Sequence, residues 1–128
     1  MIFPISFNIL SAKAIRAYLL RSAEILSPVA QATVDAYADV AGSIIDTVER
    51  ESLAIVTENT HASKSLDWKV LGSIDGVTYV EVQAEATLAF GAVGTYTTTM
   101  AVYRFYKVQV KSTGAGQASE ATVNLIAK

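Results

Sequence analysis

A single histidine, His61, is the residue with the most evident potential for acid–base or metal chemistry. It lies in the polar stretch ENTHASK, and a zinc site built on one histidine needs carboxylate or cysteine ligands at a defined spacing. The chain has no cysteine, and no such spacing surrounds His61. The G-x-S-x-G elbow that would present a serine nucleophile to a histidine is also absent. We therefore interpret His61 as a solvated loop residue.

Acidic residues form two small groups that also deserve a chemical test. Asp35 and Asp39 are predicted to share one strand face, while Asp46, Glu49 and Glu51 cluster in a predicted loop. Paired carboxylates bind calcium or hydrolyse glycosides, but neither group has the alternating ligand order of an EF-hand. We interpret both groups as solvated acidic edges, which discourage edge-to-edge aggregation. The sequence thus predicts no catalytic residue, no metal ligand and no cofactor, and hence no enzyme.

The glycines match neither a Walker loop nor a dinucleotide fingerprint, and we expect them in turns that need positive φ. Gly42 is predicted to lie in a break after residues 34–40. The other six are Gly72, Gly76, Gly91, Gly94, Gly114 and Gly116, of which Gly91 and Gly94 are predicted to bracket one turn.

Aromatic side chains are the remaining candidates for a binding surface. Trp68 shares its predicted strand face with Leu66 and Val70, so we assign it to the core. Tyr103 and Phe105 lie opposite a valine-rich strand face and are predicted to be exposed together. Exposed paired aromatics provide a large contact area at low entropic cost, and the pair therefore indicates a subunit or partner interface.

The clearest structural element is a β-hairpin over residues 65–83, SLDWKVLGSIDGVTYVEVQ. Apolar and polar residues alternate on both sides of a predicted tight turn at residues 73–76, which contains an Asp-Gly pair. The core-facing residues of its first strand alternate with Asp67 and Lys69, which are predicted to face water.

Turn signals separate similar segments along the rest of the chain. Strands are predicted at residues 34–40, 52–57, 100–111 and 120–127, and shorter pieces near residues 44–45, 84–90 and 96–99. About eight short strands with frequent turns are typical of an antiparallel β-sandwich or jelly roll. No segment among them suits a crossover helix, so the predicted fold is all-β, with the sandwich in residues 27–128.

Residues 1–26 form a separate N-terminal unit. Within it SAKAIRAYLLRSAEIL combines helix-favouring residues with a period of two, which leaves a short helix as the alternative. We favour an extended arm that leads into a first strand near residues 19–26. Apolar arms pack poorly on their own domain, so we expect contacts with a neighbouring subunit, concentrated in residues 2–20. The predicted interface residues are Ile2, Phe3, Ile5, Phe7, Ile9, Leu10, Tyr103 and Phe105.

Composition limits the possible partners. The 128 residues carry a formal net charge of -2, with 52% hydrophobic and 17% charged residues. This charge offers no footprint for phosphate backbones, so we expect no nucleic-acid partner. Lys13, Arg16 and Arg21 interrupt the apolar N-terminal region, which therefore lacks a membrane span of about twenty residues. The start also lacks the basic region of a secretory signal peptide, and we expect synthesis in the cytoplasm.

Two phrases of the sequence resemble small proteins of tailed bacteriophages and prophages. They are W-K-V-x-G-S-x-D-G-x-x-Y, which begins at Trp68, and Y-R-F-Y-K-V-Q-V, which begins at Tyr103. The resemblance covers about residues 27–128 and implies a β-sandwich virion component that decorates or cements a capsid or occupies the neck or tail. The first phrase is also similar to discoidin-like sandwiches, which are usually longer and often contain cysteines.

The function predicted from these features is a non-enzymatic structural protein of a phage virion, made in the host cytoplasm. Its predicted partners are copies of itself, in a homo-oligomer, and other virion proteins of the capsid, neck or tail. The alternative is a discoidin-like module that binds carbohydrates or surfaces. Such a module would need exposed aromatics, for which the surroundings of Tyr79 and Tyr96 are the places to look.

Overall fold

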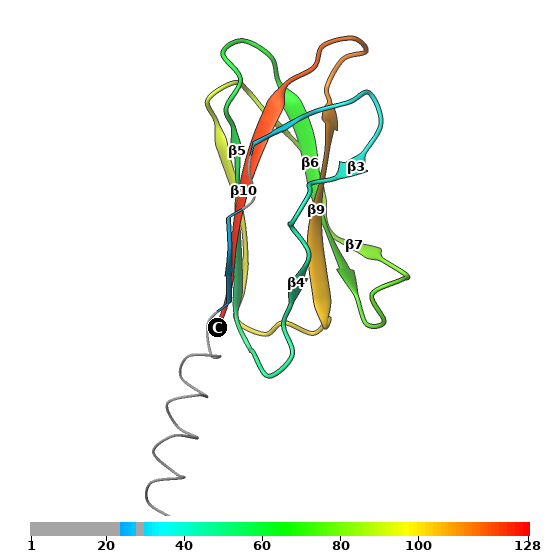
Figure 1. Ribbon diagram of the computed structural model, residues 1–128, viewed down its shortest axis with the longest axis vertical. Coiled ribbons are helices and arrows are strands. Elements are labelled where there is room, and N and C mark those ends of the chain that lie inside the picture. The colour runs from blue at the N-terminus through cyan, green and yellow to red at the C-terminus, as the bar shows by residue number, and fades with distance from the viewer. Residues whose placement is uncertain (1–23, 28–29) are drawn as a thin grey trace, which may run out of the picture.

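The computed structural model describes residues 24–27 and 30–128, which form two antiparallel β-sheets packed face to face (Figure 1). Sheet A has the strand order β1-β10-β5-β8, and β2 also pairs with β10. Sheet B has the order β3-β9-β6-β7, and β4 also pairs with β9. The strands are β1 (Glu24–Leu26), β2 (Gln31–Ala32), β3 (Ala38–Asp39), β4 (Ile45–Asp46), β5 (Leu53–Asn59), β6 (Leu66–Ser73), β7 (Val80–Leu88), β8 (Val93–Thr98), β9 (Phe105–Ser112) and β10 (Glu120–Ala127). The predicted antiparallel β-sandwich is confirmed.

The pairing of the strands is nested, as in a jelly roll. Strands β1 and β2 both pair with the last strand, and β3 and β4 both pair with β9. We count β1 and β2 as one interrupted strand, and β3 and β4 as another. Among the remaining strands, β5 pairs with β8 and β6 pairs with β7. Between β3 and β4 the interruption is a turn, closed by a Ser43 N–H bond to the Val40 carbonyl and containing Gly42 at a φ of 74°. The prediction of about eight strands corresponds to these eight paired units.

The core lies between the sheets and follows the alternation of the sequence. In β9, Tyr106, Val108 and Val110 point inward, and β10 contributes Val123 and Leu125 from the opposite sheet. Burying one large aliphatic side chain favours folding by about 1.5–3 kcal/mol, so this inward set decides which face each strand turns to the core.

Trp68 lies in this core with 2% of its surface exposed, as predicted. Its indole packs against Gly94, which belongs to strand β8 and not to a turn. A Cβ atom at Gly94 would lie 2.6 Å from Trp68 Cζ2. The prediction of a turn at Gly94 was therefore wrong, because this glycine provides space for the indole. Gly72 likewise lies within a strand, β6.

Two predicted strands are shorter than the sequence suggested. The segment 34–40 contributes only β3, because the side chains before β3 bond elsewhere. Thr33 Oγ1 lies 2.8 Å from Oγ of Ser112, the last residue of β9, and Asp35 accepts the Gly116 N–H of the β9–β10 loop. The segment 100–111 becomes a strand only from Phe105, because residues 99–104 cross from sheet A to sheet B.

The predicted hairpin is present, but its return strand starts at Val80, three residues later than expected, and continues to Leu88. Strand β1 lies within the region predicted for the first strand. The predicted contact residues Ile2, Phe3, Ile5, Phe7, Ile9 and Leu10, and the choice between arm and helix, lie outside the described residues. Within the described residues, no helix has the length and apolarity needed to cross a membrane.

Candidate functional site

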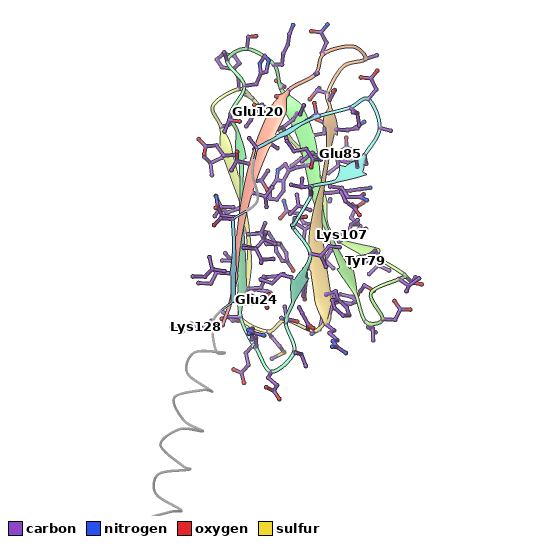
Figure 2. The ribbon with its side chains drawn as sticks, viewed as in Figure 1. Glu24, Tyr79, Glu85, Lys107, Glu120 and Lys128 are labelled. Carbon is purple, nitrogen blue, oxygen red and sulfur yellow. The ribbon has the colours of Figure 1, made fainter. Side chains whose placement is uncertain are left out.

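Three loops and both ends of the described chain meet at one end of the sandwich, which we call the hairpin end. The Ala101 N–H of the β8–β9 loop donates to the Glu51 carbonyl at 2.7 Å, and the Ser52 N–H donates to the Lys128 carbonyl at 2.9 Å. Glu24 pairs with Ala127, next to the last residue (Figure 2). The segment before residue 24 therefore joins the sandwich at this end.

The β6–β7 loop at the hairpin end is held by the Asp75 carboxylate. Its Oδ1 accepts the N–H groups of Val77 and Thr78, at 2.9 and 2.8 Å, and the hydroxyl of Ser73 at 3.0 Å. The bonds from Thr78, Val77 and Ser73 hold the pKa of Asp75 below its usual 3.8. Gly76 adopts a φ of 79°. The predicted turn role of Asp75 and Gly76 is confirmed, but the carboxylate also draws Val77 and Thr78 out of the return strand.

Tyr103 and Phe105 lie at the base of this loop, and both are half-buried. The ring of Tyr103 packs edge-on against Tyr106, with centroids 6.0 Å apart, and covers the backbone of Gly72. Phe105 lies beside Gly76, where an added Cβ would be 3.3 Å from its ring. The two residues, which were predicted to be exposed together, are each only partly exposed, because the two glycines leave room for their rings against the hairpin.

A pocket of about 210 Å³ opens between the loop and Tyr103. Gly72, Ile74, Thr78, Val80 and Tyr103 contribute to its mainly apolar walls. Sites for drug-sized ligands usually measure about 300–1,000 Å³, so this pocket suits a single apolar side chain better than a metabolite.

Several apolar side chains at the hairpin end are exposed, and two of them, Ile74 and Val80, line the pocket. We call this group the apolar end cluster; its members are Ile74, Val77, Val80, Met100 and Val102, with exposed fractions of 74%, 83%, 45%, 74% and 70%. The first three belong to the β6–β7 region and the last two to the loop that carries Tyr103. Grouped exposed apolar residues mark interaction surfaces in soluble proteins.

The outer face of sheet B is charged, and its lysines are all engaged. Lys107 contacts Asp39 at 3.0 Å and lies 4.0 Å from the centre of the Tyr79 ring (Figure 2). Lys69 and Lys111 contact Glu81 and Asp67, and both lie over the ring of Tyr37. This face therefore satisfies its own charges within one chain.

Two groups on this face have shifted pKa values. Burial opposes ionisation of Asp39, but bonds from Gln109 and Lys107 outweigh it and lower the pKa below 3.8. Burial, helped by the neighbouring Glu85 carboxylate, raises the pKa of Tyr37 above its ordinary value.

Asp67 was predicted to face water, and that prediction was wrong: it is 4% exposed. The Thr87 and Thr113 hydroxyls donate to its Oδ1 at 2.7 and 2.9 Å, because neighbouring strands and loops cover this part of the sheet.

The outer face of sheet A differs from that of sheet B. Its central cross-strand row joins Ile25, Ile126, Ala54 and Thr97, and the next row contains Val56 and Thr95. Among the described residues the charged side chains of this face are Glu58 and Glu120, toward the end away from the hairpin, and the last residue, Lys128, which pairs with Ser52 at the hairpin end. Sheet A therefore offers a largely uncharged surface.

The residues first considered for catalysis serve the structure of their own loops. His61 Nδ1 accepts the N–H groups of Ser63 and Lys64, both at 3.0 Å. Asp46 pairs with Arg104 at 3.3 Å, and Asp35 is held apart from Asp39 by its bond to the β9–β10 loop. In the described part of the chain, no group of three or more histidine or acidic side chains is placed to hold a metal ion.

Sequence reasoning missed one buried polar centre, Asn59. This side chain is fully buried at the end of β5 and donates to the carbonyls of Lys64 and Leu88, at 2.8 and 3.0 Å. Its Oδ1 accepts the His61 N–H and the Ser119 hydroxyl. The only available signal was an asparagine at an inward position of an alternating strand.

No family model matches the chain, and no curated protein matches its sequence. Solved structures nevertheless share its fold. The SPBc2 prophage-derived protein YomS aligns with a TM-score of 0.54 and 10% identity, over 82% of this chain and 91% of YomS. The PBSX exported protein XepA aligns with a TM-score of 0.48 and 14% identity, and the matched region spans 36% of XepA.

A third similar structure is that of Bacillus endospore appendages, described as a novel family of disulfide-linked pili. Its TM-score is 0.48 at 17% identity, over 83% of this chain and 86% of that one. At 10% identity the likeness to YomS, a prophage-derived protein, shows a shared fold alone.

Proposed function

We propose that this protein is a non-enzymatic structural component of a tailed bacteriophage or prophage particle, and that it assembles through contacts between its own copies. The observation that carries the proposal is the apolar end cluster, which lies at the same end of the sandwich as the attachment point of an apolar N-terminal segment. A monomer gains nothing from exposing Ile74 and Val77 there, whereas an assembly buries them.

The two sheet faces support the same proposal. The charged side chains on the outer face of sheet B are paired with one another, so this face suits contact with water. The outer face of sheet A is largely uncharged and suits contact with another protein surface. A virion protein is stabilised by many repeated subunit contacts and needs neither a catalytic centre nor disulfides. The proposal assigns no catalytic role to His61, whose Nδ1 is occupied by its own loop.

The assignment to a phage particle rests on the sequence resemblance and is supported by the fold shared with YomS, a prophage-derived protein. Within the particle, the proposed partners are further copies and neighbouring proteins of the capsid, neck or tail. The proposed site of action is the virion, after synthesis in the host cytoplasm.

The alternative of a carbohydrate-binding module gains no support from the aromatic side chains. The Tyr79 ring is covered by the Lys107 ammonium, and Tyr96 packs inward against Tyr106 with centroids 6.4 Å apart. Burial accordingly raises the pKa of Tyr96. Neither ring offers the open stacking surface that a sugar requires.

The test is the mass of the purified protein in solution by light scattering, over a range of concentrations. We expect a multiple of the 13.6 kDa chain mass. Removing residues 1–18 is expected to abolish assembly while the β-rich circular dichroism spectrum and a cooperative unfolding transition persist. A full-length protein that remains monomeric at high concentration and has no affinity for capsid or tail components would refute the proposal.

A further inference from the structure

The composition of the pocket at the hairpin end favours an apolar occupant. Its walls are mainly apolar, and the polar groups at its rim are already engaged, since Asp75 bonds within the loop and the Ser73 hydroxyl joins Asp75 and the Gly76 N–H. Beside it, Ile74 and Val77 stay exposed. A strand or loop with regularly spaced apolar side chains would insert one into the pocket and cover these neighbours.

The chain itself contains a segment of this kind. In residues 2–10, IFPISFNIL, the apolar residues Phe3, Ile5, Phe7 and Ile9 alternate with proline, serine and asparagine. A period of two places the four apolar side chains on one face of an extended segment.

We propose that residues 2–10 of one copy dock on the pocket and apolar end cluster of a second copy, with an aromatic side chain of the segment filling the pocket. This inference deepens the proposed function and rests on the self-assembly stated there. It also connects the two sets of predicted interface residues, since the arm would contact the surface around Tyr103.

The length and composition of the connection assign the pocket to a different copy. The thirteen residues between Leu10 and Glu24 contain no glycine, proline, asparagine or aspartate, and serine is their only common turn residue. Thirteen residues span about 20 Å as a helix and about 43 Å when extended. A connection that does not reverse its direction would carry residues 2–10 away from their own sandwich and toward a neighbour.

Such a contact is heterologous, because one copy provides the segment and the other provides the pocket. Each bound copy keeps one free segment or one free pocket, so the contact repeats into a ring or a linear array. Rings and stacked arrays are the arrangements that a capsid, neck or tail protein forms.

Two substitutions in the full chain test the contact, with circular dichroism as the check on folding. Phe7→Asp removes the apolar face of the segment, and Val80→Asp places a charge in the pocket wall. Each is expected to weaken self-association at least about tenfold, as loss of a central interface residue does. Asn8→Asp is the matched control, because it adds the same charge on the opposite face of the segment, and assembly is expected to persist. Ile74→Asp repeats the pocket test at an exposed position if Val80→Asp fails to fold.

Mixing the two defective variants gives a sharper result. The Val80→Asp copy retains an intact segment, and the Phe7→Asp copy retains an intact pocket. One copy of each is therefore expected to form a heterodimer, which cannot grow further because its remaining segment and pocket are both defective. Light scattering should then report a species of twice 13.6 kDa, absent from either variant alone. A mixture that stays monomeric would overturn the proposal.

Cross-linking identifies which copy supplies the segment, and the absence of native cysteine removes background. Differently tagged copies carrying Phe7→Cys and Val77→Cys are expected to form a disulfide-linked heterodimer, whereas Ala62→Cys, at the opposite end of the sandwich, is the negative control. A Phe7→Cys, Val77→Cys double variant that closes within one chain overturns the assignment to a second copy. Assembly unaffected by Phe7→Asp and Val80→Asp refutes the docking site but leaves the proposed function standing, while a monomeric wild type refutes both.

Discussion

Adding one methyl group at Gly94 tests whether the core is arranged around Trp68 as described. An alanine Cβ at this position would lie 2.6, 2.8 and 2.9 Å from Trp68 Cζ2, Cε2 and Nε1. Favourable contacts between carbon atoms lie at about 3.5–4.0 Å, so three atoms of a rigid ring would each be about 1 Å too close. The indole is 2% exposed and has no free space to rotate into.

The expected cost follows from this geometry. Overpacking a well-filled core usually costs about 1–3 kcal/mol. We expect Gly94→Ala to lower the free energy of unfolding by about 3 kcal/mol, the upper end of this range. The cost is high because β8 is held in register with β5 and the indole is held between the sheets. For a domain of this size that loss lowers the melting temperature by roughly 10 °C.

Trp68 is the single tryptophan, so its fluorescence reports directly on the perturbed site during urea unfolding. The matched control is Gly114→Ala, where the added Cβ meets only the flexible Gln117 side chain, at 3.3 Å, and the expected change is within about 0.5 kcal/mol. Both variants must be compared at one protein concentration, because self-association adds stability. A Gly94→Ala protein as stable as the control would show that the indole does not pack on β8.

Further predictions concern stability and assembly. Asn59→Ala leaves buried carbonyl groups unbonded and is expected to cost about 3 kcal/mol in urea unfolding, whereas the exposed Asn124→Ala should change little. Gly72→Ala displaces the half-exposed Tyr103 ring, so it is expected to cost only about 1 kcal/mol but to weaken assembly in light scattering. The free energy of unfolding should fall as the pH drops below about 4, because the unfolded chain then binds more protons than the folded chain, whose carboxylates have lowered pKa values. The midpoints of urea unfolding at pH 3, 5 and 7 test this expectation. The groups with lowered pKa values are Asp39, Asp46 and Asp75.

The hairpin shows which structural features local sequence patterns predict and which they do not. Alternation around an Asp-Gly pair correctly predicted two paired strands, the inward position of Trp68 and the loop between them. The start of the return strand was missed because it depends on which N–H groups the Asp75 carboxylate accepts. The burial of Asp67 was missed because Thr113, which donates to it, comes from another part of the chain.

The surroundings of the two predicted interface aromatics depended on the tertiary structure. Tyr103 and Phe105 are half-buried because their rings lie against Gly72 and Gly76 of the hairpin. The apolar end cluster had no signature of its own, since Val77 and Val102 look like ordinary strand residues in the sequence. Only the crossing of the β8–β9 loop brings Tyr103, the neighbour of Val102, against Gly72 of the hairpin.

By itself the sequence determined the all-β class. Apolar residues that recur with a period of two all lie on one face of a strand, and a sheet buries that face. It also determined the inward positions of Leu66, Trp68 and Val70 in β6 and the valine-rich face of β9. The tertiary structure decided what depends on contacts distant in sequence: the nested jelly-roll pairing, the place of Gly94 beneath an indole, and the pocket between a loop and a tyrosine about thirty residues further along the chain. Such features follow from steric fit between strands, and steric fit has no local pattern.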